Sequence, residues 1–325
     1  MTDRTGHVGA RRVPAWAALA VAVTIGLLTA LQARVNGQLG AGLGDGFVAA
    51  VISFGSGLVI LVVLSAALPA GRRGFTALAT GIRGRSIPWW MLAGGVAGAL
   101  TVATQGVAVA LIGVSLFTVG VVAGQTVCGL VLDRVGYGPA GVVAVTLPRL
   151  AGGALALSAV AVAITAGGVD VPWWMLALPF LAGMGIAWQQ ATNGRLRQRV
   201  GTPLTATLVN FIGGTAVQVV AALIDVAVVG PPTRFPAEPW LYTGGAIGVV
   251  YIFLSAAIVR HTGVLLLGLG VVVGQLLTSV VLDLLWPAPA GPGLGRQLVM
   301  VALALLSVVV AAAPWRRAPG ARRSG

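Results

Sequence analysis

The sequence has few of the residues with which a soluble protein covers its surface. Only 8% of its 325 residues are charged, lysine is absent, and Cys128 is the single cysteine. One cysteine excludes a disulfide within the chain and a zinc site built from cysteines. With 58% hydrophobic residues and a mean hydropathy of +0.98, most of the chain is expected to lie in lipid.

The strongly positive charge does not indicate a nucleic-acid partner. The net charge of +13 comes from 20 basic residues, all arginine, against 7 acidic ones. These arginines flank apolar runs, as expected for residues that orient membrane helices, and they form no basic patch with interleaved aromatics. The sequence also lacks a GxxxxGK[ST] loop, an HExxH pair and a dense His/Asp/Glu cluster. We therefore expect no cofactor, no metal and no enzymatic activity.

Ten apolar runs predict ten transmembrane helices, because each is long enough to cross a ~30 Å hydrocarbon core. The runs cover residues 15–35, 46–68, 88–110, 113–132, 148–168, 173–193, 203–229, 239–259, 262–285 and 297–313. The predicted fold is an all-α integral membrane protein. Its parts are a basic tail (1–14), a first five-helix repeat (15–168), a second five-helix repeat (173–313) and a second basic tail (314–325).

The second half of the chain repeats the first half. Residues 26–57 recur at 183–214 with an offset of 157, and residues 90–133 recur at 240–283 with an offset of 150. The matches include glutamine, aspartate and tryptophan, which this composition would seldom align by chance. Because each half has an odd number of helices, the second half must enter the membrane in the opposite orientation.

The distribution of arginine agrees with this inverted arrangement. If both termini lie in the cytoplasm, only Arg34, Arg234 and Arg296 fall in segments on the outer side. An excess of arginine in the inner segments is the usual pattern. We therefore predict a 5+5 inverted-topology repeat with both termini in the cytoplasm.

Amide side chains inside the apolar runs are the candidate substrate site. Each pair four residues apart shares one helix face, and an amide in lipid must face protein or water. The candidate cavity-lining residues are Gln32, Asn36, Gln105, Gln125, Gln189, Asn193 and Gln275. The alternative is that these side chains only join neighbouring helices by hydrogen bonds. The pattern leaves both interpretations open.

Two equivalent carboxylates lie at the ends of the fourth and ninth predicted helices. Asp133 and Asp283 are related by the offset of 150 and fall on opposite sides of the predicted membrane. They are candidates for coupling to a proton or cation, and the alternative is a capping or solvated carboxylate at the interface. No carboxylate lies clearly at the centre of a run, so the sequence does not identify a coupling ion.

The fifth and tenth runs contain almost only alanine, leucine, valine and serine. With no polar side chain to satisfy, Gly152–Thr165 and Leu298–Ala313 are expected at the periphery. They would face lipid or a second copy of the chain in a homodimer.

The repeated motifs resemble the drug/metabolite transporter (DMT) superfamily and, within it, the EamA-like YdcZ-type branch. The resemblance is carried by Gln32-xxx-Asn36-Gly37-x-Leu39, Ser53-Phe54-xx-Gly57, Gly124-Gln125 to Asp133, and their counterparts Gln189-xxx-Asn193-Gly194-x-Leu196, Asn210-Phe211-xx-Gly214 and Gly274-Gln275 to Asp283. It implies a ten-helix bacterial inner-membrane protein that exports a small metabolite or drug by alternating access. The implied partners are a small-molecule substrate and membrane lipids.

Two other functions remain open at this point. One is a flippase for a lipid or lipid-linked precursor, or an accessory subunit of such a protein. The other is a membrane enzyme, which would need two carboxylates or a metal cluster converging in space. The predicted placement of Asp133 and Asp283 on opposite faces does not supply such a pair.

Overall fold

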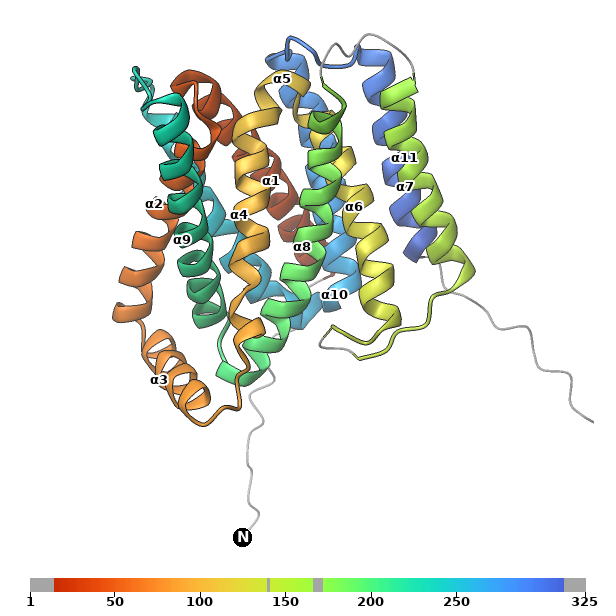
Figure 1. The fold of residues 1–325 in the computed structure, drawn as a ribbon. Coiled ribbons are helices and arrows are strands. Elements are labelled where there is room, and N and C mark those ends of the chain that lie inside the picture. Colours follow the sequence, from red (N-terminus) through yellow and green to blue (C-terminus); the bar gives the residue numbers. More distant parts are fainter. Residues whose placement is uncertain (1–14, 139–140, 166–171, 313–325) are drawn as a thin grey trace, which may run out of the picture.

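The computed structural model describes residues 15–138, 141–165 and 172–312. For residues 255–269 only the course of the helix is described. The described chain is helical throughout, with its long helices side by side in a bundle (Figure 1). The predicted basic tails, 1–14 and 314–325, lie outside the described residues.

The helices follow one another with short connections. The α-helices of the described chain are α1 (Ala15–Leu43), α2 (Gly46–Ala67), α3 (Pro69–Arg83), α4 (Gly94–Thr104), α5 (Ala110–Ile112), α6 (Val114–Arg134), α7 (Leu147–Thr165), α8 (Trp173–Val200), α9 (Pro203–Val229), α10 (Gly244–Leu285) and α11 (Leu294–Ala312). Two 3-10 turns, η1 (Trp89–Leu92) and η3 (Pro239–Tyr242), precede α4 and α10, and a π-helical turn, η2 (Gln105–Val109), joins α4 to α5.

Six helical segments among the described residues are long and apolar enough to cross a membrane. They are Leu19–Leu43, Gly46–Ala67, Trp89–Ile112, Val114–Arg134, Pro203–Val229 and Leu294–Ala312. Shorter apolar segments cover Leu147–Val162, Gly244–Leu254 and Gly270–Leu285. The structure therefore agrees with an all-α membrane protein.

Local sequence explains two of the sharp connections. The Asp45 carboxylate accepts hydrogen bonds from the backbone N–H groups of Phe47 and Val48, at 2.8 and 2.9 Å, and so caps the start of α2. Gly113 has φ 84°, a backbone conformation that favours glycine. The predicted break at Ile112-Gly113 is confirmed, because α5 ends at Ile112 and α6 begins at Val114.

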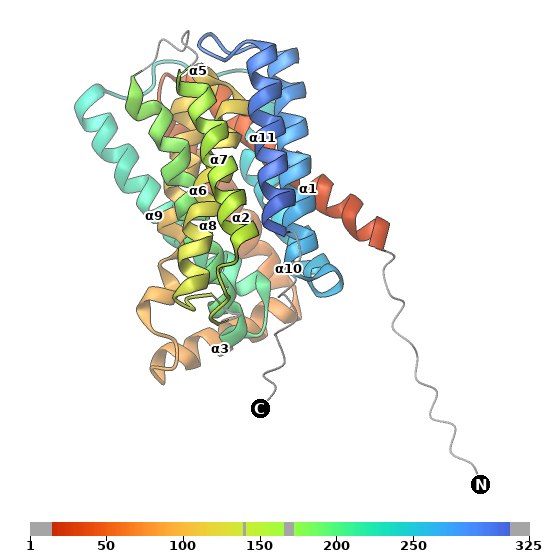
Figure 2. The ribbon, with the colours of Figure 1, turned by 90° about the vertical axis from the view of Figure 1, so that its right-hand side faces the viewer.

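The helix assignment of α10 differs from the prediction of two separate runs. The chain is helical without interruption from Gly244 to Leu285, but it reverses its direction along α1. Gly244 lies beside Asn36, near the end of α1, and Gly270 lies beside Ala22, near its start. Trp286, directly after α10, lies beside Arg34, again toward the end of α1. The two predicted runs thus correspond to two antiparallel legs of α10, whose reversal Figures 1 and 2 show near the α3 end of the bundle.

Three features of the helices were not predicted. The first and sixth predicted runs end at 35 and 193, but α1 continues to Leu43 and α8 to Val200. The arginine-rich connection after the second run contains the helix α3, whose buried stripe is Gly71, Gly74, Leu78 and Gly81. This stripe has helical spacing, but three glycines in it lower the intrinsic helix propensity.

The main packing joins the predicted first half to the second half. Helix α1 packs along α10, α8 along α4 and α6, α2 along α9, and α7 along α11. The rings of the equivalent residues Phe54 and Phe211 touch, with centroids 5.0 Å apart. Helices α7 and α11, which hold the fifth and tenth runs, form a pair at one edge of the bundle (Figure 1).

Candidate functional site

The first amide cluster joins α1 to the start of α10 and to η2. The Gln32 amide donates to the carbonyl oxygen of Gly244 at 2.8 Å, and the Asn36 amide donates to Oε1 of Gln105 at 2.7 Å. All three side chains are buried, with exposed fractions of 5% for Gln32, 0% for Asn36 and 3% for Gln105. Three predicted site residues therefore come together here. The π-helical turn places Gln105 among them, and such turns are frequent at functional sites.

The second amide cluster joins α8 to α9. The side chains of Gln189 and Asn193 both donate to Oδ1 of Asn210, at 2.9 and 3.1 Å. Asn210 is buried, whereas Gln189 and Asn193 are partly exposed. Asn210 was not among the predicted site residues. The available signal was an amide at the position equivalent to Ser53, in a helix that also carries Gln218 and Asp225.

Equivalent glycines contact the two clusters in equivalent ways. Gly98 of α4 lies against Gln189, and Gly248 of α10 lies against Gln32. Gly94 and Gly244, the first residues of their helices, lie against Asn193 and Asn36. A Cβ at any of these four glycines would overlap the amide or force it to move. Each amide pair is thus enclosed by a glycine-lined helix from the other half of the chain.

The remaining predicted amides lie outside both clusters. Gln125 of α6 is partly exposed and Gln275 of α10 is buried. Each follows a glycine at a close helix crossing, since Gly124 touches the carbonyl of Phe180 and Gly274 touches that of Val23. The hydrogen bonds of the described side chains link neither glutamine to the clusters.

Asp283 occupies the N-terminus of α6. Its two carboxylate oxygens accept hydrogen bonds from the backbone N–H groups of Val114 and Ser115, at 2.8 and 2.7 Å. The carboxylate is buried, and it supplies the cap that Gly113 cannot provide because glycine has no side chain. A carboxylate at a helix N-terminus binds otherwise unpaired N–H groups and interacts favourably with the helix dipole.

Among the described residues, Arg34 is the cation whose charge acts on the Asp283 carboxylate. It belongs to the interior of α1 rather than to an outer connection, and only 6% of its surface is exposed. Its guanidinium carbon lies 5.9 Å from the ring centre of Trp286, within cation–π range. The prediction that Arg34 flanks a membrane helix is therefore wrong, since the side chain is buried between helices.

Asp133 has different surroundings, although it is equivalent to Asp283. It accepts a hydrogen bond from Nη1 of Arg149 at 2.7 Å, and about a third of each side chain is exposed. Exposed ion pairs contribute little to stability. The two predicted coupling residues therefore form one buried cap and one solvent-exposed ion pair.

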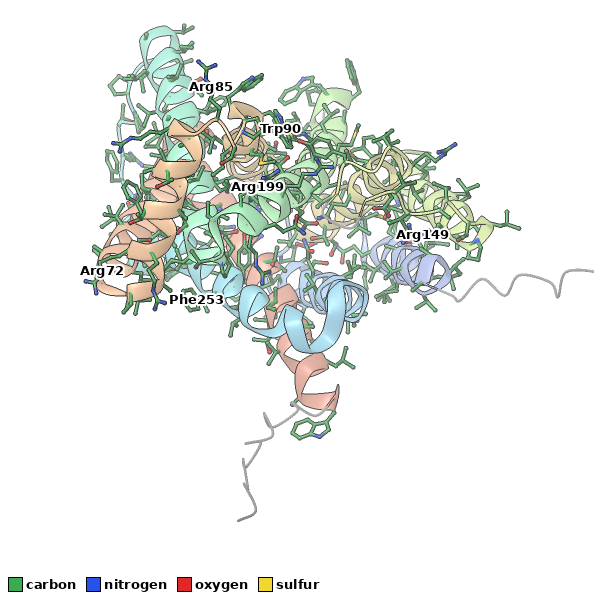
Figure 3. All side chains as sticks on the ribbon, turned by 90° about the horizontal axis from the view of Figure 1, so that it is seen from below. Arg72, Arg85, Trp90, Arg149, Arg199 and Phe253 are labelled. Carbon is green, nitrogen blue, oxygen red and sulfur yellow. The ribbon has the colours of Figure 1, made fainter. Side chains whose placement is uncertain are left out.

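Arg195 connects three segments at the α3 end. Its Nη2 donates to the carbonyl oxygen of Gly136 at 2.8 Å, and its guanidinium carbon lies 5.7 Å from the ring centre of Trp90 and 5.2 Å from that of Tyr137. Figure 3 looks onto this end of the bundle, where Trp90 and Arg199 are labelled. Arg195 was predicted only to set the orientation of the chain, so this contact is an addition.

Two hollows with defined linings lie at the α3 end. The larger, of about 660 Å³, lies between α3 and the end of α8. The smaller, of about 250 Å³, is lined by Met91, Gly138, Gly141, Arg195, Gln198 and Arg199. Neither is lined by the predicted amides, so the amide-lined cavity stays a prediction.

Comparison with known proteins identifies the family. The profile described as "Putative inner membrane exporter, YdcZ", a DMT family, matches residues 17–162 and 173–310. The chain belongs to the YdcZ family. This confirms the resemblance seen in the repeated motifs, and the two matched segments fall within the two predicted repeats. The family description is that of an inner-membrane exporter, and it names no substrate.

A solved structure resembles this chain in fold. The structure, titled "Crystal structure of protein", has a TM-score of 0.50 and 16% sequence identity, and the alignment covers 93% of this chain and 98% of that one. At this identity the likeness concerns the fold alone. No curated protein sequence matches the chain significantly.

Proposed function

We propose that this YdcZ protein is a secondary transporter that exports a small metabolite or drug across the inner membrane by alternating access. The observation that carries the proposal is the reciprocal enclosure of the amide pairs. Gln32 with Asn36 meets Gly248 and Gly244, and Gln189 with Asn193 meets Gly98 and Gly94. Related sites at the interface of inverted repeats are the arrangement that secondary transporters use.

The proposed topology is ten spans arranged as a 5+5 inverted repeat. The six long segments, the three shorter ones and α8 supply the ten spans. The equivalent residues Phe54 and Phe211 touch each other. Equivalent residues of two repeats meet in this way only near the pseudo-two-fold axis that relates the repeats. Contact of Gly74, in α3, with Thr202, before α9, supports antiparallel directions for the equivalent helices α2 and α9.

The difference in exposure between the amide clusters supports alternating access. The first cluster is closed to solvent, whereas Gln189 and Asn193 are partly exposed. Two equivalent sites in unequal states fit a conformation open on one side only, and exchange of the two states would open the other side. With both termini in the cytoplasm, the α3 end faces inward and its arginines follow the positive-inside rule.

Single-cysteine labelling tests this asymmetry. In a Cys128→Ser background, Gln189→Cys is expected to react with a membrane-impermeant maleimide several times faster than Gln32→Cys, because the first site is partly exposed and the second is buried. Reaction should occur from the cytoplasmic side in inverted vesicles. Leu19→Cys, which is exposed in α1, gives the rate for a lipid-facing position. Equal rates at positions 32 and 189 would contradict the one-sided opening.

Solute flux tests transport itself. In proteoliposomes with an imposed pH gradient, we expect the wild-type chain to carry a small solute and Asn36→Ala/Asn193→Ala to carry it at least about tenfold more slowly, since amide hydrogen bonds of about 1 kcal/mol each are lost at both sites. The matched control is Gln190→Ala, an amide on α8 that is exposed to solvent. It should transport normally. Absence of flux for every soluble compound would favour the alternative, a flippase, which labelled lipids in the same vesicles would reveal.

The outer faces of α7 and α11 are the proposed surface for a homodimer. The two helices already pack against each other, and Gly152 lies against the backbone of Ser307 and the side chain of Ala311. Leu157 of α7 and Val309 of α11 remain exposed, at 46% and 62%. Lipid alone would also satisfy such a face, so the mass of the purified protein in a nanodisc decides between one copy and two.

A further inference from the structure

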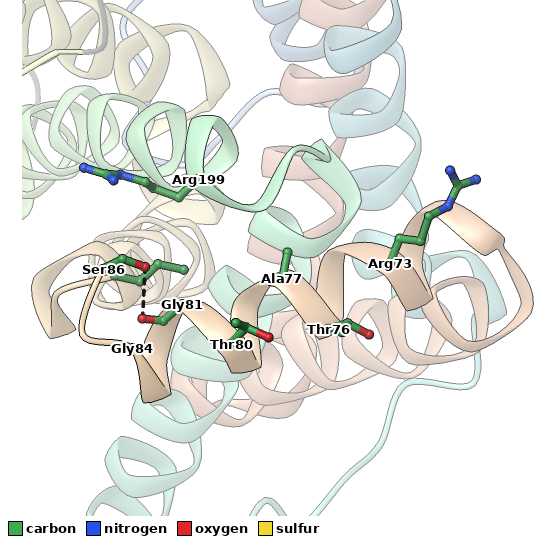
Figure 4. A pocket seen from close by; sticks show the side chains of 9 residues that line it. Arg73, Thr76, Ala77, Thr80, Gly81, Gly84, Ser86 and Arg199 are labelled. Atoms are coloured by element: carbon green, nitrogen blue, oxygen red, sulfur yellow. Dashed lines mark hydrogen bonds between the residues drawn. The ribbon is translucent and has the colours of Figure 1, made fainter.

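The larger hollow at the α3 end is a groove that carries positive charge and hydroxyl groups. It is lined by Arg73, Thr76, Ala77, Thr80, Gly81, Gly84, Ser86, Ile87 and Arg199, and it is an open hollow of about 660 Å³. Arg73 and Arg199 come from its opposite ends, with Thr76 and Thr80 of α3 between them, and their guanidinium groups point away from each other (Figure 4). None of the lining residues is acidic.

The surrounding charges are also positive. Helix α3 and the turn after it carry Arg72, Arg73, Arg83 and Arg85, and the end of α8 carries Arg195, Arg197 and Arg199, with no acidic residue in either stretch. Figure 3 shows Arg72, Arg85 and Arg199 spread over this end of the bundle. A hollow bordered by one sign of charge concentrates ions of the opposite sign.

The geometry of α3 separates the groove from the lipid. Arg73, Thr76 and Thr80 lie on one face of the helix, whereas Phe75 and Ile82, exposed at 57% and 44%, lie on the opposite face. In a helix beside the membrane surface the apolar face turns toward the lipid. The groove therefore opens to the aqueous side, beneath the bundle, and receives solutes rather than lipid headgroups.

We infer that this groove binds a soluble anion carrying a phosphate or carboxylate group, and that it is the docking site from which an anionic substrate reaches the half-open amide cluster. Guanidinium groups and hydroxyls are suitable donors to such oxygens. Helix α8 carries both Arg199 of the groove and, two turns earlier, Asn193 of the cluster. The substrate assignment rests on the proposed transport function, whereas the anion site does not.

Equilibrium binding tests the anion site on the full chain in detergent. Glucose 6-phosphate and citrate are expected to bind, and glucose and choline are not. Arg73→Gln/Arg199→Gln should weaken binding by about tenfold or more, because two charge-assisted donors are lost. The matched control, Arg72→Gln/Arg197→Gln, removes the same charge from the same two helices outside the groove and should change binding less than about twofold by long-range effects alone.

Further measurements keep the inference falsifiable. Ala77→Phe places a ring in the groove without changing the charge and should also weaken binding. Equal losses in the two double variants, or equal binding of glucose and glucose 6-phosphate, would overturn the anion site. Stronger binding of dioctanoyl phosphatidylglycerol than of glucose 6-phosphate would overturn the aqueous assignment and indicate a lipid site.

Flux separates this inference from the transport proposal. We expect the wild-type chain to carry anions. This flux should be lower in Arg73→Gln/Arg199→Gln and unchanged in Arg72→Gln/Arg197→Gln. Carriage of only neutral or cationic solutes would overturn the substrate class while leaving the transporter intact. Absence of all flux would overturn the transport proposal, and the binding measurements would still decide the groove.

Discussion

Gly274→Val is expected to prevent stable assembly of the bundle. At this position α10 passes so close to α1 that an added Cβ would overlap the carbonyl oxygen of Val23. The obstacle is backbone rather than the end of a flexible side chain, so α1 and α10 would have to separate. Overpacking of this kind costs about 3 kcal/mol or more where no side chain can move aside. Close backbone approach is a main source of stability between helices in lipid.

Thermal stability in detergent measures this effect. We expect the temperature at which half of the protein remains monodisperse to fall by at least about 5 °C, given a loss of this size in a chain of this length. The equivalent substitution, Gly124→Val, places a side chain against the carbonyl of Phe180 and should be about as damaging. Gly129→Val is the matched control for Gly124→Val, since Gly129 also lies in α6 and a Cβ added there has nothing within 4 Å. A stable Gly274→Val protein would show that the crossing of α1 and α10 is looser than described.

The spacing of these glycines can be read from the sequence, but their partners cannot. Gly120 and Gly124, and the equivalent Gly270 and Gly274, are four residues apart, a spacing typical of close helix contacts. Nothing in a periodic pattern tells which helix approaches a glycine. The structure shows that Gly124 meets α8 and Gly274 meets α1, so each contact joins the two halves.

The amide pairs were predictable because polar side chains are rare in these helices. Gln32 with Asn36, and Gln189 with Asn193, stand out by their i, i+4 spacing and by their recurrence. Their hydrogen-bond partners were only partly predictable, since Gln105 is a lone glutamine in an apolar run and Asn210 differs from its counterpart Ser53. Comparison of the two repeats does not reveal a functional residue when its counterpart in the other repeat is a different residue type.

Helix α3 was missed because its buried face is made mostly of glycine. A helix is usually recognised by large apolar residues at helical spacing, and here Leu78 is the only one in the buried stripe. The neighbouring arginines resembled a charged connection. Small residues suffice for burial at this point because α3 lies close to the end of α2, where Gly71 touches the backbone of Ser65.

The unequal surroundings of Asp133 and Asp283 could not be read from the repeat. The two residues are equivalent in sequence, yet one pairs with the partly exposed Arg149 and the other caps α6. The difference arises because the chain is broken at Gly113 in the first half but stays helical at the equivalent position in the second half. Gly113 interrupts the helix and leaves backbone N–H groups for Asp283, whereas α10 stays helical through the equivalent residue 263.

Asp283→Asn is accordingly expected to destabilise the protein far more than Asp133→Asn. The asparagine amide can accept through only one oxygen, so one N–H of Val114 or Ser115 loses its partner, and the buried Arg34 loses the charge that faces it. Leaving one buried N–H donor without a partner costs about 1 to 3 kcal/mol. Loss of an exposed ion pair such as Asp133–Arg149 costs less than about 1 kcal/mol.

A double substitution separates the cap from the charge. Arg34→Gln/Asp283→Asn removes both buried charges and should recover part of the stability lost in Asp283→Asn, because no unpaired charge remains. The same proteins, assayed for flux under a pH gradient, test the coupling role. If Asp283 is mainly a cap, the double variant regains gradient-driven flux together with its stability. A stable double variant that carries solute but no longer responds to the gradient would instead make Asp283 the coupling carboxylate, with its capping of α6 as the link between protonation and helix movement.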